Sequence, residues 1–211
     1  MKKLAIGCGV LVVLGIILLA IIAIAGGGYN GLVKKSQAVD SAWATVQTDY
    51  QRRADLIPNL VSTVAGAANF EKSTLVEVTE ARASVGKVTA NGGAAPTDPA
   101  KLAEFEQAQN QLSSALSRLL VVVERYPDLK ANSGFVTLQA QLEGTENRIA
   151  VSRRDFNNAV QAYNTAIKSF PAVFYAGALG FKEKPYFAAT PGSETAPKVQ
   201  FDFTNPPPAK P

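Results

Sequence analysis

Apolar residues recur at alternating spacings of three and four along most of this chain, which is the pattern of amphipathic helices. Four such segments follow one another between the triple glycine at residues 26–28 and Phe170. We therefore predict an all-α fold in which each helix buries one face. The apolar positions are Val39, Trp43, Val46, Tyr50 and Ile57 in the first segment; Val61, Val64, Ala68, Leu75, Val78 and Val85 in the second; Leu102, Phe105, Leu112, Leu116, Leu119, Val123 and Tyr126 in the third; and Leu138, Leu142, Ile149, Phe156, Val160, Tyr163, Ile167 and Phe170 in the fourth.

Two stretches interrupt this pattern and predict connections between helices. Residues 91–99 are rich in Gly, Ala and Pro, and Thr97 or Asp98 can cap the helix that follows. Residues 126–132, Tyr-Pro-Asp-Leu-Lys-Ala-Asn, predict a turn between the third and fourth helices.

Pro58 decides how the first two segments are connected. A proline inside a helix removes one hydrogen bond and clashes with the preceding turn, at a cost of about 3 kcal/mol. If the chain reverses between Asp55 and Asn59, four helices of comparable length result, and each can bury its apolar face. We therefore predict an antiparallel four-helix bundle, with a three-helix coil that contains one long kinked helix as the alternative.

The N-terminal segment has a different character. Residues 4–25 are 22 positions without a charge, and as a helix they reach roughly 33 Å, enough to cross the hydrocarbon core of a bilayer. We predict a transmembrane helix, with a signal peptide cleaved near the triple glycine as the alternative. Lys2 and Lys3 precede the apolar stretch and favour an N-terminus inside the cell and a soluble domain outside the cytoplasm.

Three regions follow from these patterns. Residues 1–28 form the membrane anchor with a glycine hinge at its end, and residues 29–187 form the helical domain. Residues 188–211 are rich in proline and predict a disordered tail.

The composition excludes several kinds of chemistry. The chain has no histidine, and its single cysteine, Cys8, lies inside the apolar stretch, so the helical domain offers neither disulfides nor the usual zinc ligands. The net charge of +4 includes Lys2 and Lys3, which leaves 19 basic against 17 acidic residues and no concentrated patch for nucleic acid. Pairs of carboxylates such as Glu143 and Glu146 are common on helices and do not by themselves indicate an acid and a base. We therefore expect no enzyme, no cofactor and no metal site.

Four blocks of sequence resemble the LemA family of bacterial membrane proteins. They are residues 52–61, residues 126–132, residues 142–150, and the positions Arg153, Arg154, Asn157, Tyr163, Asn164, Phe170 and Pro171. Phe156 stands where that family is expected to have tyrosine, which removes one hydroxyl group. The resemblance implies an N-terminal anchor and a helical bundle, and it implies no catalytic activity.

Two groups of polar residues are candidates for binding. Arg53 falls on the apolar face of its helix and needs a carboxylate partner. If the chain reverses at Pro58, Glu124 and Asp128 are within reach. We expect a partner-recognition tip there, or a set of caps and ion pairs that fixes the turn, formed by Arg52, Arg53, Asp55, Asn59, Tyr126, Asp128, Lys130 and Asn132.

The second group lies on the fourth helix, at spacings of seven, four and seven. At 100° per residue these positions form one stripe at the boundary of the apolar face. Such a stripe either sets helix register through hydrogen bonds or serves as a lateral docking surface. Its residues are Glu146, Arg153, Asn157 and Asn164.

Together these features indicate a non-enzymatic, membrane-anchored interaction or scaffold module of a bacterial cell envelope. It would contact the bilayer through residues 4–25 and unidentified proteins through its helical domain. A sensor or accessory subunit of a membrane complex is one alternative, and an enzyme that works without histidine and cysteine is another. Association of several copies stays open.

Overall fold

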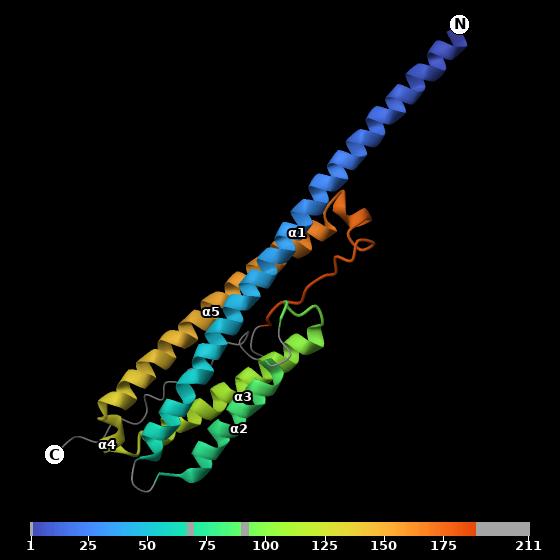
Figure 1. The fold of residues 1–211 in the computed structure, drawn as a ribbon. Helices are drawn as coiled ribbons and strands as arrows, with labels where there is room; N and C mark the ends of the chain where they lie inside the picture. The colour runs from blue at the N-terminus through green and yellow to red at the C-terminus, as the bar shows by residue number, and fades with distance from the viewer. Residues whose placement is uncertain (1, 67–69, 90–92, 189–211) are drawn as a thin grey trace, which may run out of the picture.

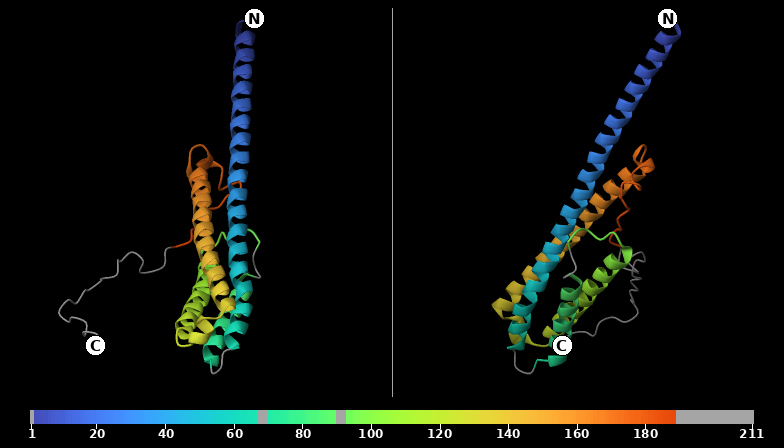
Figure 2. Two further views of the ribbon diagram at one scale, coloured as in Figure 1. Left: turned by 90° about the vertical axis from the view of Figure 1, so that its left-hand side faces the viewer. Right: turned by 45° about the vertical axis from the view of Figure 1, so that its right-hand side comes forward.

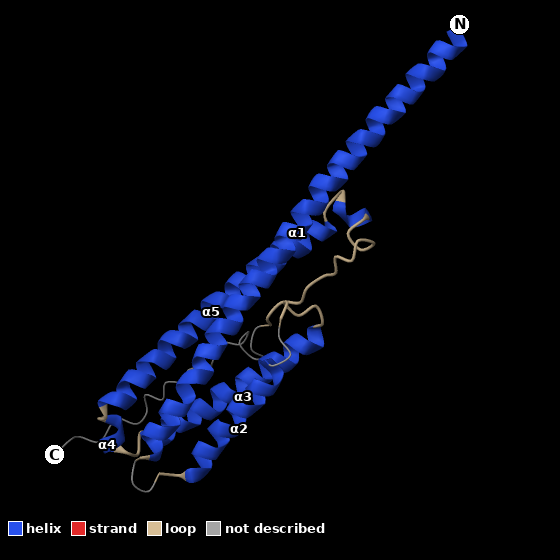
Figure 3. Ribbon diagram, viewed as in Figure 1, coloured by secondary structure: helices blue, strands red, loops and turns tan. Residues whose placement is uncertain are grey.

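The computed structural model describes residues 2–66, 70–89 and 93–188, without the side chains of residues 2–14, 16–25 and 89. The described part is built from helices and loops and contains no strand, which confirms the predicted all-α class (Figure 3). The predicted tail, residues 189–211, lies outside the described residues. The helices are α1 (Lys2–Ala65), α2 (Lys72–Thr89), α3 (Pro99–Val123), the short α4 (Pro127–Lys130), α5 (Ser133–Lys168) and the 3₁₀ turn η1 (Ala172–Phe174).

The four long helices alternate in direction along the chain (Figure 1). Helices α1 and α5 pack along each other, and α2 and α3 form a hairpin that covers the half of this pair nearest α4 (Figure 2). The N-terminal part of α1 projects beyond the opposite end of the bundle. Asp98 caps α3 by accepting a hydrogen bond from the Ala100 amide, and Asn132 caps α5 by accepting from the amides of Gly134 and Phe135.

The predicted reversal at Pro58 is wrong. Helix α1 continues through Pro58 to Ala65, and the chain turns only in the connection to α2. Proline cannot donate the hydrogen bond that the carbonyl of Ala54 would accept within the helix. Arg82 of α2 compensates, because its Nε donates to that carbonyl at 2.9 Å. A side chain from the neighbouring helix therefore satisfies the group that the proline leaves free.

The helices enclose two apolar clusters. One is formed around Trp43, Phe105 and Phe156, toward the end from which α1 projects. The other is formed around Leu60, Leu112 and Leu119, toward α4. The predicted apolar positions of the first, third and fourth segments are buried in these clusters, apart from partly buried Tyr126 and Leu138 and from Phe170.

Phe170 corrects the prediction for the fourth segment. It is 82% exposed, and it lies two positions after Lys168, where α5 ends. Val61 and Leu75 of the second segment are only partly buried, and Ala68 lies outside the described residues.

An extended segment, residues 181–188, completes the first cluster; we call it the strap. The chain leaves α5, turns through η1 and enters the strap after Gly180, whose φ of 84° is readily adopted only by glycine. The strap then runs back along the α1–α5 pair, and Phe187 packs against the rings of Trp43 and Phe156 at centroid distances of 6.0 and 5.3 Å. It thus covers apolar side chains in the half that the α2–α3 hairpin leaves open.

Within the described residues, we find no helix that is both long and apolar enough to cross a membrane. For the predicted transmembrane segment, residues 4–25, the structure describes the helical backbone but no side chain. The backbone is helical through the triple glycine. The glycine hinge concerns motion, and it stays a prediction.

Candidate interaction site

Arg53 lies at the boundary between the two apolar clusters. It is 1% exposed, and its guanidinium reaches across from α1 to both α3 and α5. Nη1 donates to Glu146 Oε1 at 2.7 Å and to Ser113 Oγ at 2.9 Å. Nη2 donates to Gln109 Oε1 at 2.5 Å and to the Gln109 carbonyl at 3.3 Å. This polar layer joins three helices at one level, because displacing α3 or α5 would remove some of the partners of a buried charge.

The predicted partners of Arg53 were wrong. Because α1 continues past Pro58, Arg53 lies about three turns before its end, which puts Arg53 away from the turn after α3. Glu124 instead pairs with Lys130, and the carboxylate bound to Arg53 is Glu146 of the predicted α5 stripe. The structure thus joins one residue from each predicted group, which the sequence analysis did not anticipate.

The remaining tip residues separate into two places. Arg52, Asp55 and Asn59 are exposed and line a shallow hollow on the outer face of α1. Tyr126, Asp128 and Asn132 line a smaller hollow at the end of the bundle. The eight predicted tip residues therefore do not form one surface.

Asn157 and Asn164 hold the strap. Asn164 Nδ2 donates to the Lys184 carbonyl at 2.8 Å, and its Oδ1 accepts from the Lys184 amide at 3.0 Å. Asn157 makes the same pair of bonds with Phe187, at 3.1 and 2.9 Å. The spacings agree: seven residues of helix rise about 10.5 Å, and three residues of extended chain cover about 10 Å. The stripe on α5 thus binds an extended segment of its own chain.

Two further bonds fix the strap. Tyr163 donates its hydroxyl hydrogen to the Lys182 carbonyl at 2.9 Å. The buried Nζ of Lys184 donates to Asp40 of α1 at 2.8 Å, and Asp40 also accepts from the Ala95 amide. Asp40 therefore connects α1, the strap and the loop before α3. Burial raises the pKa of the Tyr163 hydroxyl, and the Asp40 carboxylate raises it further.

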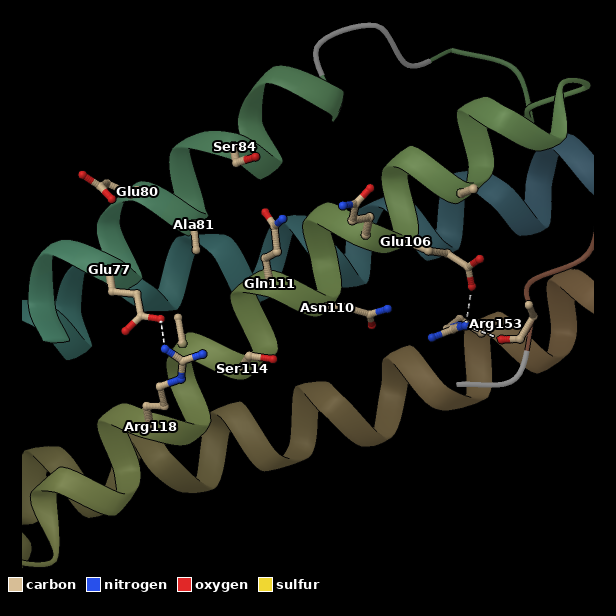
Figure 4. A pocket seen from close by; sticks show the side chains of 14 residues that line it. Glu77, Glu80, Ala81, Ser84, Glu106, Asn110, Gln111, Ser114, Arg118 and Arg153 are labelled. Carbon is tan, nitrogen blue, oxygen red and sulfur yellow. Dashed lines mark hydrogen bonds and ion pairs between the residues drawn. The ribbon is translucent and has the colours of Figure 1, made fainter. Parts of the chain in front are cut away.

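Where the strap ends, a polar groove runs along α3, with α2 on one side; we call it the α2–α3 groove (Figure 4). Its volume is about 750 Å³. Figure 4 shows an ion pair at each end: Arg118 with Glu77 at 2.6 Å and Arg153 with Glu106 at 2.8 Å. Between them lie side chains that both donate and accept hydrogen bonds, namely Gln107, Asn110, Gln111, Ser84 and Ser114.

Arg153 connects the strap with the groove. It pairs with Glu106, donates to the Ala188 carbonyl at 3.2 Å, and lies over the Phe187 ring at 4.6 Å. Burial raises the pKa of the Glu106 carboxyl, and the nearby Arg153 charge and a backbone hydrogen bond lower it by a smaller amount. The groove therefore begins at a partly desolvated ion pair.

Sequence reasoning missed most residues of this groove. Glu77, Glu106 and Arg118 occur on ordinary polar faces, and only the pairing of α2 with α3 brings them together. Gln109 gave a usable signal, because it interrupts an apolar face, and it is buried beside Arg53.

Within residues 2–66, 70–89 and 93–188, no group of three acidic residues is arranged to hold a metal ion.

Comparison with known proteins gives a consistent result. A sequence model of the LemA family matches residues 42–201 of this chain. The magnetosome protein MamQ of Magnetospirillum gryphiswaldense is 26% identical, over 79% of this chain and 67% of its own length. MamQ 2 of Paramagnetospirillum magneticum is 28% identical over the same shares. Protein LemA of Metamycoplasma hominis is 24% identical, over 68% of this chain and 61% of its own length. The family match includes α2, α3, α5 and the strap.

Proposed function

This chain belongs to the LemA family, and from that premise we propose that it is a non-enzymatic, membrane-anchored helical module that binds an extended segment of a partner protein in the α2–α3 groove. The anchor is residues 4–25, whose 22 uncharged positions match the thickness of a bilayer core. The helical domain is held at the membrane surface by this segment. Its relatives carry the names magnetosome protein and Protein LemA, and neither name refers to a catalysed reaction.

The observation that carries this proposal is that the stripe on α5, next to the groove, already binds extended chain. Asn157 and Asn164 each bind the backbone amide and carbonyl of one strap residue. The α2–α3 groove starts at Ala188, where the strap ends, and offers Asn110, Gln111 and Gln107 as similar amides. An extended segment would therefore find the same kind of partners in the groove.

The dimensions and charges of the groove fit such a segment. Glu106 and Arg118 are twelve positions apart on α3, which corresponds to about 18 Å, or about five residues of extended chain. The ion pairs at the two ends offer both signs of charge to side chains of the partner. Recognition of an extended peptide gains affinity from main-chain hydrogen bonds and specificity from contacts with its side chains.

Site-specific photocrosslinking tests this proposal. A photoreactive amino acid replaces Gln111, which is exposed in the groove, or Gln161, which is exposed on α5 and does not line the groove. We expect the full-length chain to form a discrete product crosslinked to a partner protein only when the photoreactive amino acid is at position 111. The Asn110→Ala change should reduce that product without altering the thermal unfolding temperature, because Asn110 is exposed.

Two results would contradict the proposal. Identical products from positions 111 and 161 would mean that the contact does not involve the groove. An undiminished product in the Asn110→Ala variant would mean that the amides do not contribute to binding.

A further inference from the structure

The turn after α5 carries an exposed apolar cluster. Phe170 is 82% exposed and Phe174 is 78% exposed, and their rings meet edge to face at a centroid distance of 5.9 Å. Val173 and Leu179 of the same turn are each about half exposed. We call these four residues the apolar cap.

The cap differs from the other exposed apolar residues in the described chain. Val76, Val121, Val136 and Val151 are single valines on helices, and the remaining two, Tyr29 and Tyr186, are tyrosines with a polar hydroxyl group. Two phenylalanines that contact each other in water are costly, because removing apolar surface from water is worth about 25 cal/mol per Å². Exposed apolar groups that gather in one place indicate an interaction surface.

The position of the cap relative to α1 is fixed by close packing. Gly28 lies against Tyr175, and a Cβ atom at position 28 would clash with the Tyr175 hydroxyl oxygen. The next residue, Tyr29, packs edge to face on Phe181 at 5.6 Å. These contacts bracket the turn and hold it beside α1, at the end from which the N-terminal part of α1 projects (Figures 1 and 2).

This position has a simple relation to the uncharged segment. Gly28 follows Ala25, the last residue of that segment, by three positions, which correspond to about 4.5 Å along the helix. The headgroup layer on each side of a bilayer core is about 5 to 8 Å thick. If residues 4–25 fill the core, the cap therefore lies at the level of the headgroups. Lys34 and Lys35, both exposed, follow about 9 Å beyond Gly28.

We propose that the apolar cap inserts into the headgroup layer of the bilayer in which residues 4–25 are anchored. This inference rests on the membrane anchor of the proposed function. The cap then provides a second contact with the membrane, made by the turn after α5. Two contacts from different parts of the chain fix the tilt of the bundle, which a single helix does not. Phenylalanine and leucine side chains of surface-bound helices are buried at the boundary between headgroups and acyl chains.

Spin labelling of the full-length chain in phosphatidylcholine and phosphatidylglycerol vesicles tests this inference. Cys8 is first replaced by serine. A nitroxide is then attached at Phe174→Cys in the cap or at Val121→Cys on α3, which is similarly exposed at 70%. Collisions with oxygen, which enriches in lipid, are compared with collisions with a water-soluble nickel complex. A carbonate wash of the same vesicles measures the anchor independently. We expect loss of nickel accessibility and gain of oxygen accessibility at position 174 alone, in chains that resist the wash.

Each other outcome has a definite meaning. If the chain resists the wash and position 174 is as accessible to nickel as position 121, the inference is overturned while the anchor stands. If the wash releases the chain, the anchor fails and the inference fails with it. If the label at 174 shows spin–spin broadening that unlabelled chain removes by dilution, the cap contacts a second copy instead of lipid. A label at Phe170→Cys repeats the measurement, so that distortion by one label cannot decide the result.

Discussion

Replacing Glu146 by alanine tests whether the polar layer around Arg53 stabilises the fold. Glu146 is 46% exposed. Among the described residues it is the only carboxylate partner of Arg53, which donates a hydrogen bond of 2.7 Å to it. Losing a partner of a fully buried ion pair costs about 3 to 5 kcal/mol. Here the loss is smaller, because Arg53 keeps its bonds to Ser113 and Gln109. A hydrogen bond to a charged group is worth about 1.5 to 3 kcal/mol, so we expect a loss of about 2 kcal/mol.

Urea unfolding of the full-length chain in mild detergent, followed by circular dichroism, measures this loss. A matched control is Glu143→Ala, one turn away on α5, because Glu143 is exposed and, among the described residues, accepts only a long bond of 3.3 Å from Gln139. The control should change stability by less than about 0.5 kcal/mol. In a thermal melt, 2 kcal/mol corresponds to about 4 to 8 °C for a chain of this size. If the two variants unfold alike, Glu146 contributes no more than an ordinary surface carboxylate, and the reasoning about the layer is refuted.

Three further predictions address other contacts. Arg82→Met should destabilise the chain by about 1 to 3 kcal/mol, because it leaves the carbonyl freed by Pro58 unsatisfied. In a Pro58→Ala background, where the helix can satisfy that carbonyl itself, the same change should cost clearly less; equal losses in urea melts would exclude this explanation. Asn164→Ala removes two hydrogen bonds to the strap and should speed hydrogen exchange at the Lys184 amide, whereas unchanged exchange would show that Asn164 does not contribute to holding the strap. The raised pKa of Glu106 favours its protonated form in the folded state, so its contribution to stability is present below the ordinary value of 4.5 and is lost as the pH rises through the raised value. The stability of Glu106→Gln relative to the unsubstituted chain should therefore increase from pH 4 to pH 7, and a decrease would mean that the ion pair outweighs burial.

The helical fold was predictable because helix formation depends on local spacing. Most positions assigned to the apolar faces of the first, third and fourth helices are buried, and the Gly, Ala and Pro stretch before α3 is a connection, as expected. Pro58 misled the prediction, because the usual cost of a proline inside a helix assumes that the freed carbonyl has no other donor. Here a distant side chain donates a hydrogen bond to that carbonyl. Arg82 follows Pro58 by 24 positions, and nothing in the local sequence marks it as the donor to the Ala54 carbonyl.

The candidate sites were predictable only in part, for a related reason. The spacing of Asn157 and Asn164 predicted that they share one face of α5, because helical periodicity determines which residues share a face. What the stripe binds depends on the path of the chain after α5, and this path is not periodic. Likewise, Arg53 was recognised as a buried charge in need of a carboxylate, but the choice of Glu146 depended on how far α1 continues.

The strap also has a consequence for the order in which the chain can fold during synthesis. Phe187 covers Trp43, and the two are 144 positions apart. Ribosomes add about 5 to 20 residues per second, so about 7 to 30 seconds pass between the synthesis of the two residues. During this interval the aromatic cluster around Trp43 lacks part of its cover, and the nascent chain exposes an apolar surface. A chain that terminates before residue 181 would keep this apolar surface uncovered after synthesis.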